Sequence, residues 1–131
     1  MDAENLGDSI NTQFNEFEPL IAPDESFLIF MAGGRPDGRG GFDLYVSYNR
    51  EGKWTKPENL GDKIKSSANE YSPIISPDNK YFFWTSARGF ADKPLESRLD
   101  YQKLMNRLRS PRNGLGGIYY IDLTTLNITH H

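Results

Sequence analysis

Short hydrophobic runs separated by turn residues make up most of the chain, and this pattern predicts strands rather than helices. Residues 27–32 are apolar at every position, as expected of a strand that is buried on both faces. We expect further strands over residues 17–22, 43–48 and 53–60, with a hairpin turn at 49–52 before the last of them. Four short strands joined by turns are typical of one blade of a β-propeller.

The same strand pattern occurs twice. Residues 4–24 (ENLGDSINTQFNEFEPLIAPD) and residues 58–78 (ENLGDKIKSSANEYSPIISPD) are identical at 12 of 21 positions, with an offset of 54 residues. The similarity continues in the next two strands, first at the same offset and then at an offset of 74, where residues 43–47 align with 117–121. We call the two units the first repeat and the second repeat. The second repeat therefore holds 20 additional residues between its second and third strands.

The additional residues predict a helix. Tyr101, Leu104, Met105 and Leu108 have the spacing of one helical face. Residues 97–100 resemble a capping box that would start this helix, and Ser110-Pro111 would end it. Because it connects the second and third strands, we expect the helix to lie outside the sheet, on a rim.

Composition excludes several classes of protein. The chain has 131 residues, a net charge of −3 and 37% hydrophobic residues, which suits one soluble domain. It has neither a run of apolar residues long enough for a membrane span nor a signal-peptide leader. There is no cysteine, and the two histidines are His130 and His131, so thiolate sites, His-containing triads and His-rich metal sites are excluded from the body of the chain. We expect no metal and no cofactor.

Positive charge is concentrated in the insertion. Residues 88–112 carry seven basic and three acidic side chains, a net charge of +4, which leaves −7 for the remainder. One interpretation is a docking element for an acidic protein or peptide, or for an anionic glycan or lipid headgroup. The other is a helix that packs on the neighbouring blade and pairs with the acidic remainder. The candidate partner-binding residues here are Arg88, Lys93, Arg98, Arg107, Arg109 and Arg112. Nucleic acid is not an expected partner, because the pI is about 5.3.

The repeated motif resembles the TolB-type, WD-like β-propeller repeat family. In the first repeat the resemblance is carried by Asn15, Glu16, Pro19, Pro23, Asp24, Gly41, Asp43, Tyr45, Trp54, Pro57 and Gly61. In the second repeat it is carried by Asn69, Glu70, Pro73, Pro77, Asp78, Ile118 and Tyr119, while Gly117 replaces the Asp usual in the family. The resemblance implies an all-β fold of four-stranded antiparallel blades. It also implies a non-enzymatic binding or scaffold module with a periplasmic or secreted location, which recognises a protein or peptide at its loop face.

Two repeats are fewer than the 4–8 blades of a closed propeller. We therefore expect residues 1–131 to be one propeller segment, with a first blade at 9–62 and a second blade at 63–131 that contains the helical insertion 90–113. Residues 4–8 (ENLGD) repeat residues 58–62, the part that follows Trp54 in the first repeat and has no counterpart at the end of the second, so residues 1–8 are expected to complete the last blade as its outer strand. Head-to-tail assembly of copies would then close a ring, and the resemblance favours a trimer with six blades; two copies would give four. The alternative is a fragment excised from a longer propeller.

Four polar residues enter the innermost strands at matching positions: Asn15, Glu16, Asn69 and Glu70. One interpretation is a ligand or cation site at the mouth of the central channel. The other is that each Glu accepts backbone N–H groups of the adjacent blade. We expect Arg35 and Arg88 to pair with nearby carboxylates. Alternative functions are a glycan-acting propeller of the sialidase or lyase kind, which would use Arg88, Tyr71 and Glu70 from symmetric copies, and a piece of a peptidase-associated propeller.

Overall fold

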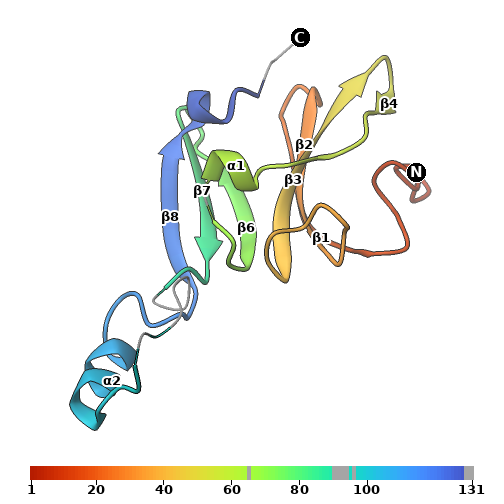
Figure 1. The fold of residues 1–131 in the computed structure, drawn as a ribbon. Helices are drawn as coiled ribbons and strands as arrows, with labels where there is room; N and C mark the ends of the chain where they lie inside the picture. The colour runs from red at the N-terminus through yellow and green to blue at the C-terminus, as the bar shows by residue number, and fades with distance from the viewer. Residues whose placement is uncertain (65, 90–94, 96, 129–131) are drawn as a thin grey trace.

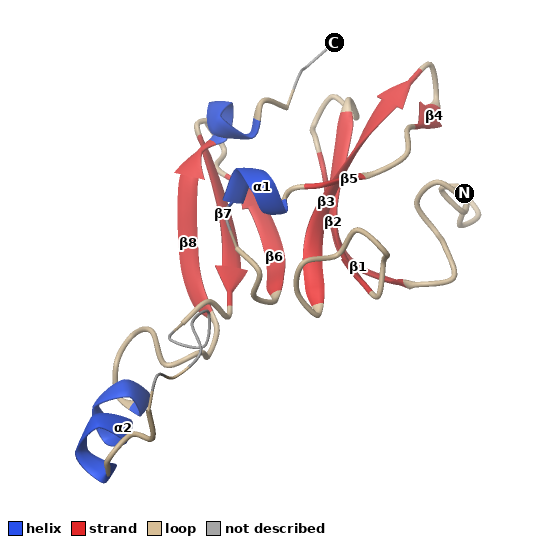
Figure 2. Ribbon diagram, in the orientation of Figure 1, coloured by secondary structure: helices blue, strands red, loops and turns tan. Residues whose placement is uncertain are grey.

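Two antiparallel sheets lie side by side, with a helix hanging below the second one (Figure 1). The computed structural model describes residues 1–64, 66–89, 95 and 97–128. Strands predominate over helices (Figure 2), which confirms the mostly-β class predicted from the alternating runs. The long strands of each repeat form one sheet, and the short helix α1 (Gly61–Ile64) lies between the two sheets in the sequence.

The first sheet contains the strands of the first repeat and a short strand from the start of the second. β1 (Asn15–Ile21) pairs with β2 (Phe27–Gly33), which pairs with β3 (Phe42–Arg50). The strand β2 is buried at six of its seven positions, as its uninterrupted apolar sequence predicts. Two short strands, β4 (Lys53–Trp54) and β5 (Glu58–Asn59), both pair with β3.

The predicted fourth strand over 53–60 is wrong as a continuous element. It is divided into β4 and β5 because Thr55, between them, bonds to β3 through its side chain as well as its backbone, which interrupts the regular strand pairing. The Thr55 hydroxyl accepts from the Tyr48 backbone N–H at 3.0 Å, and its carbonyl accepts from the Ser47 hydroxyl at 2.7 Å. Pro57, just before β5, has no N–H to offer a ladder.

The second sheet has the order β6 (Glu70–Ile75), β7 (Tyr81–Ser86) and β8 (Gly117–Asp122). Its inner strand shares an irregularity with the first sheet: Glu18 in β1 and Ser72 in β6 both have positive φ, 50° and 54°, at the point where the strand register shifts. After β8, the 3-10 helix η2 (Leu123–Leu126) replaces the hairpin that joins β3 to β4.

The main hydrophobic core lies between the two sheets. The first sheet contributes one face of β2 and β3, and the second contributes the facing side of β7 together with α1 and η2. Phe82, Ile29, Leu44, Val46 and Leu126 are each 0% exposed there. A fully buried side chain of this size stabilises the fold by about 1.5–3 kcal/mol, so the contact between the repeats is the principal source of stability.

The helix α2 (Tyr101–Leu108) forms as its spacing predicts, but its first residue differs. Its N-cap is Asp100, whose carboxylate accepts from the Lys103 backbone N–H at 2.8 Å, so the expected capping box beginning at Ser97 is wrong. All eight residues of α2 are described and none is buried. The helix lies beyond the ends of β7 and β8 (Figure 1), outside the sheet as expected.

Residues 1–8 form no strand within the described chain; Gly7–Ile10 form a turn in which the Ile10 N–H donates to Gly7 O at 3.1 Å. A role in completing a blade requires a partner and stays a prediction. The division of the chain at residues 8 and 62 also stays a prediction.

Candidate functional site

Glu70 lies at the centre of a buried polar cluster in the second sheet. It is 0% exposed and accepts hydrogen bonds from Trp84 Nε1 at 2.5 Å and Ser86 Oγ at 2.9 Å. The Arg88 guanidinium lies 3.7 Å away. Burial raises the pKa of the Glu70 carboxyl, while the hydrogen bonds and the Arg88 charge act in the opposite direction.

Arg88 is held on all sides by its own repeat and by α1. Its guanidinium stands over the rings of Tyr119, at 4.6 Å, and Trp84, at 5.4 Å. It donates to the Ile64 carbonyl at 3.2 Å and from Nε to Ser86 Oγ at 2.9 Å. The prediction that Arg88 pairs with a nearby carboxylate is confirmed.

The first repeat contains the same cluster. Arg35 pairs with Glu16 at 3.1 Å, and its guanidinium lies 5.4 Å from the Phe30 ring and 5.0 Å from the Tyr45 ring. It donates to the carbonyl of Ile10, which is 54 residues before Ile64. The same contacts occur in both repeats. In each, the arginine links a segment near the start of the repeat, at Ile10 or Ile64, to the sheet that follows.

The donors to these carboxylates come from the same repeat, whereas one of the two interpretations placed backbone N–H groups of the adjacent blade there. Thr12 donates to Glu16 through its hydroxyl at 2.5 Å and its N–H at 3.4 Å. Glu70 and Arg88 are thus paired inside the fold, and the Glu70 carboxyl is buried away from solvent.

The two asparagines differ in their surroundings. Asn69 Oδ1 accepts from the Phe42 N–H at 3.1 Å, across the contact between the repeats. A side chain at Gly40 or Gly41 would collide there, since a Cβ would lie 2.3 Å from the Ala68 carbonyl oxygen or 2.7 Å from Asn69 Oδ1. Asn15, at the matching position of the first repeat, lies on an exposed surface.

A hydrophobic surface that sequence reasoning did not single out covers one face of the second sheet. We call it the open face; it consists of Ile74, Tyr81, Phe83, Ile118 and Tyr120. Ile118 is 80% exposed and Tyr120 is 64% exposed. The rings of Tyr81, Phe83 and Tyr120 pack together, with centroids 5.6 to 6.4 Å apart. Such an exposed apolar surface is characteristic of a binding site.

The matching face of the first sheet is largely buried. Leu44 and Val46 align with Ile118 and Tyr120 at the offset of 74 residues, and both are 0% exposed. The second sheet covers them. The repeat alignment was the available signal for the open face, because it shows apolar residues retained at positions that need a cover.

A second unfilled surface lies on the opposite side of the first sheet, where the amino-terminal segment crosses it. A hollow of about 130 Å³ is lined there by Leu6, Ile10, Phe17, Leu28 and Phe30, among others. Leu6 is 44% exposed, whereas Leu60, at the matching position of the second repeat, is 0% exposed. We call this the amino-terminal surface.

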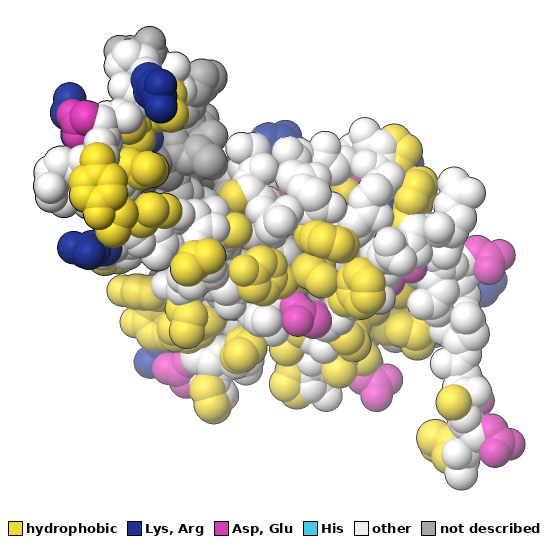
Figure 3. Space-filling model, turned by 90° about the horizontal axis from the view of Figure 1, so that it is seen from below, with side chains coloured by type: hydrophobic (Ala, Val, Ile, Leu, Met, Phe, Trp, Pro, Cys, Tyr) yellow, Lys and Arg dark blue, Asp and Glu magenta, His cyan; other side chains and the backbone are white. Residues whose placement is uncertain are grey.

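The basic insertion presents a third surface. Hydrophobic side chains of α2 lie between basic ones at the upper left of Figure 3; Tyr101 is 74% exposed, Leu108 53% and Leu104 43%. Arg98 and Arg109 are exposed, and so is Arg112, while Arg107 is half-buried. Lys93 lies outside the described residues. The second interpretation of the insertion was a helix that packs on the neighbouring blade. Within the chain, α2 does not pack on the first sheet.

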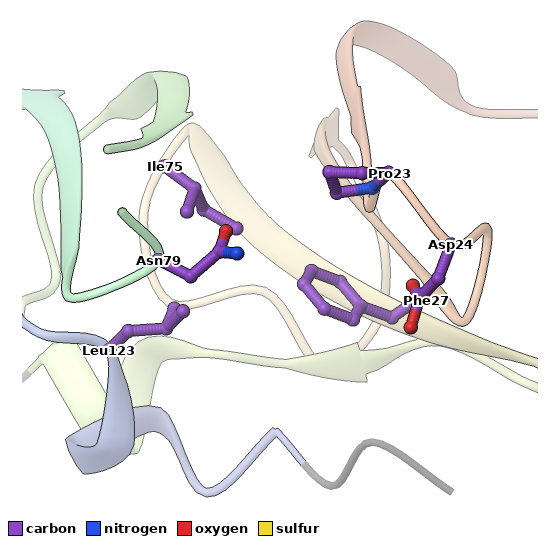
Figure 4. Close-up of a pocket in the computed structure, with 6 residues that line it drawn as sticks. All are labelled: Pro23, Asp24, Phe27, Ile75, Asn79 and Leu123. Atoms are coloured by element: carbon purple, nitrogen blue, oxygen red, sulfur yellow. The ribbon is translucent and has the colours of Figure 1, made fainter. Parts of the chain in front are cut away.

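A small cavity opens between the two sheets at the turns that follow β1 and β6. Phe27, Ile75 and Leu123 line it with apolar side chains, and Asp24 and Asn79 lie at its edge (Figure 4). Its volume is about 160 Å³. None of the residues predicted to bind a ligand lines this cavity, and it brings no group of titratable side chains together.

No set of three potential metal-ligating side chains is brought together among the residues that the structure describes. In the same residues, no helix is long and apolar enough to cross a membrane. No family model matches this chain, and neither a curated protein nor a solved structure is detectably similar to it.

Proposed function

We propose that the chain is a non-enzymatic, propeller-type binding module that works by docking another polypeptide on its open face. The observation that carries this proposal is the 80% exposure of Ile118 at a position where the first repeat has the fully buried Leu44. Aromatic residues in the open face add large contact areas with few rotatable bonds, which suits a protein interface.

Two further observations support binding rather than catalysis. The acidic and basic residues that might serve a glycan-acting enzyme, Glu70 and Arg88, are engaged with each other and with Trp84 inside the sheet. In contrast, the hydrophobic residues of the open face, such as Ile118 and Tyr120, are exposed and have no other described part of the chain packed over them. The periplasmic or secreted location implied by the family resemblance is part of the same proposal.

Capture with matched variants tests the proposal. Wild-type chain and Ile118→Glu, each immobilised, are exposed to an extract of the producing cells, and bound proteins are quantified. A charge in the centre of an interface should reduce the affinity of the partner at least about tenfold. Leu95→Glu, which changes an exposed leucine outside the open face and outside α2, serves as the matched control. Partners retained equally by wild type and Ile118→Glu, or substrate turnover unaffected by that substitution, would contradict the proposal.

A second binding function is favoured by α2 itself. Its exposed leucines, with Lys103 and Arg109 beside them, suit an acidic amphipathic peptide, for which the hydrophobic face supplies area and the charges supply orientation. Fluorescence anisotropy with an acidic amphipathic peptide and a basic peptide of the same hydrophobic sequence tests this. Only the acidic peptide should bind, more weakly at high salt, and Leu108→Glu should abolish its binding.

A further inference from the structure

The contact between the two repeats contains a short strand pairing. The strand β5 adds to the outer edge of β3, with Glu58 opposite Val46. The Leu60 backbone N–H then donates to the Leu44 carbonyl at 2.8 Å. The start of the second repeat is thereby hydrogen-bonded to the last long strand of the first.

Side-chain packing and one polar contact complete the same interface. Leu60 packs in the core with Leu44 and Val46, and all three are 0% exposed. At the lower end, Asn69 accepts from the Phe42 N–H. These contacts show how the start of the second repeat covers the outer edge of the first sheet.

Both halves of this interface occur again on the exterior of the molecule. The segment 4–6 (ENL) is identical to 58–60, and Ile118 and Tyr120 occupy the positions of Leu44 and Val46. Among the described strands, β8 pairs only with β7, so its outer edge is available, as the outer edge of β3 is for β5.

The amino-terminal segment is already shaped for this role. The Gly7 N–H donates to Asn5 Oδ1 at 2.8 Å, and the Gly61 N–H donates to Asn59 Oδ1 at 2.7 Å. Residues 5–7 therefore have the local hydrogen bond that residues 59–61 have when they are bound to a sheet. A preorganised segment loses less conformational entropy on docking.

From this correspondence we infer that the partner of the open face is a second copy of the chain, bound head to tail by its amino-terminal surface. The inference rests on the proposed function, because it names the occupant of the same face. Glu4 of the second copy lies opposite Tyr120, and its Leu6 N–H donates to the Ile118 carbonyl. Leu6 fills the apolar surface that Ile118 and Tyr120 present, as Leu60 does inside the chain.

One position departs from the template. Leu115 stands where the first repeat has Gly41, whose Cβ would lie 2.7 Å from Asn69 Oδ1. Asn15 of the second copy meets Leu115 at this point and turns its side chain aside to make room. The remaining contacts are unaffected, because the strand pairing and the leucine packing lie further along β8.

The contact joins two different surfaces. A row of bound copies therefore always has one unoccupied surface of each kind at its ends, and assembly continues until these two meet and close a ring. Propellers close with about 4–8 sheets, which corresponds to two to four copies of this chain. Three copies of the 14.9 kDa chain, the number that the resemblance favours, have a mass of about 45 kDa.

Complementation between two defective variants tests the inference. Ile118→Glu disables the open face and leaves the amino-terminal surface intact, whereas Leu6→Glu does the reverse. Both residues are exposed in the isolated chain, so both variants should fold, which circular dichroism verifies. By light scattering on a size-exclusion column, wild type and Leu95→Glu should be closed assemblies, and each defective variant alone should be a monomer of 14.9 kDa. An equimolar mixture should form a dimer, about twice that mass, with a single intact contact.

Three results would overturn the inference: a monomeric wild type, a mixture that stays monomeric, or a Leu6→Glu variant with the wild-type mass. The last of these would indicate that the open face pairs with itself. Failure here is distinguishable from failure of the proposed function. A monomeric wild type whose captured partner is lost in Ile118→Glu still docks a polypeptide on the open face, but that polypeptide is not a second copy.

Discussion

The two sheets share a sequence pattern and a strand order, yet the same face is buried in one and exposed in the other. Phe27, Ile29, Leu44 and Val46 are at most 1% exposed because the second sheet covers them. Their counterparts in the second sheet, with Ile118 80% exposed, have no such cover within the described chain. The difference lies in the neighbour that each sheet has, since both faces are apolar.

This comparison shows that a repeat of this kind cannot bury its own hydrophobic faces. Each sheet has two, and each face needs an adjacent sheet, as in other arrays of stacked units. The buried Glu–Arg clusters do not follow this rule, because both repeats complete theirs internally: Arg35 reaches Glu16, and Arg88 reaches Glu70. The polar clusters hold each unit together, and the apolar faces join units.

The largest expected effect comes from truncating matched residues on the two faces. Leu44→Ala should lower the free energy of unfolding by about 3 kcal/mol, because it leaves a cavity in the core. Ile118→Ala should lower it by less than about 0.5 kcal/mol, because the side chain is exposed. Chemical denaturation of both variants in a Leu6→Glu background, which removes the proposed contact between copies, measures the difference. Equal losses would contradict the comparison.

Removing the charge of Glu70 should have a smaller effect. Glu70→Gln places an amide among the donors Trp84, Ser86 and Arg88, at a cost of about 2 kcal/mol. Because burial raises the pKa of Glu70 in the folded state, the proton-linked stability of this group is fully present below its ordinary pKa. It is lost as the pH rises through the raised value.

The stability difference between wild type and Glu70→Gln should therefore increase on acidification from neutral pH. Urea titrations at a series of pH values measure it, and the variant removes the contribution of the other carboxyl groups from the comparison. A difference that decreases on acidification would show that the pairing with Arg88 outweighs burial.

A reciprocal exchange at one matched position sharpens the comparison of the polar clusters. Arg88 Nε donates to Ser86 Oγ, but the matching position in the first repeat is Ala32, and Arg35 Nε is buried without a hydrogen-bond partner among the described residues. Ala32→Ser should add an acceptor and stabilise the chain by about 1 kcal/mol, whereas Ser86→Ala should destabilise it by at least that amount. Thermal unfolding should show shifts of opposite sign; two shifts of the same sign would contradict the correspondence.

The smallest expected effect on global stability is at α2. Asp100→Ala removes the N-cap, which costs an isolated helix about 1 kcal/mol. Because none of the eight residues of α2 is buried, the midpoint of global unfolding should not change, while far-UV circular dichroism should lose helical signal. A lowered midpoint would show that α2 packs on the rest of the fold.

Much of the architecture followed from sequence alone because the two repeats support each other's interpretation. The strand β2 is apolar throughout and its counterpart β7 begins at the same offset, so both were predicted closely. The break between β4 and β5 was missed, since it depends on a side-chain hydrogen bond of Thr55 that no propensity records. The N-cap of α2 was predicted at Ser97, three positions before the observed Asp100, because both residue types suit an N-cap.

The candidate site was predicted less well than the fold. Glu16, Glu70 and Arg88 were selected for their charge. The structure shows Glu70 paired with Arg88 and Glu16 paired with Arg35, and each arginine lies over an aromatic ring of the same sheet. The open face was not predicted as a site, because apolar residues in strands are normally assigned to the hydrophobic core. Only three-dimensional structure shows that Tyr120 lacks the cover that Val46 has.

Interchain disulfide formation tests the central claim most directly, since the chain contains no cysteine of its own. Single-cysteine variants Glu4→Cys and Tyr120→Cys are mixed and oxidised, with Val46→Cys/Glu58→Cys as the intrachain positive control for the same strand pairing. The account predicts a disulfide between the two different chains, and much less with Asp2→Cys in place of Glu4→Cys. Equal yields from Asp2→Cys and Glu4→Cys would contradict the head-to-tail contact.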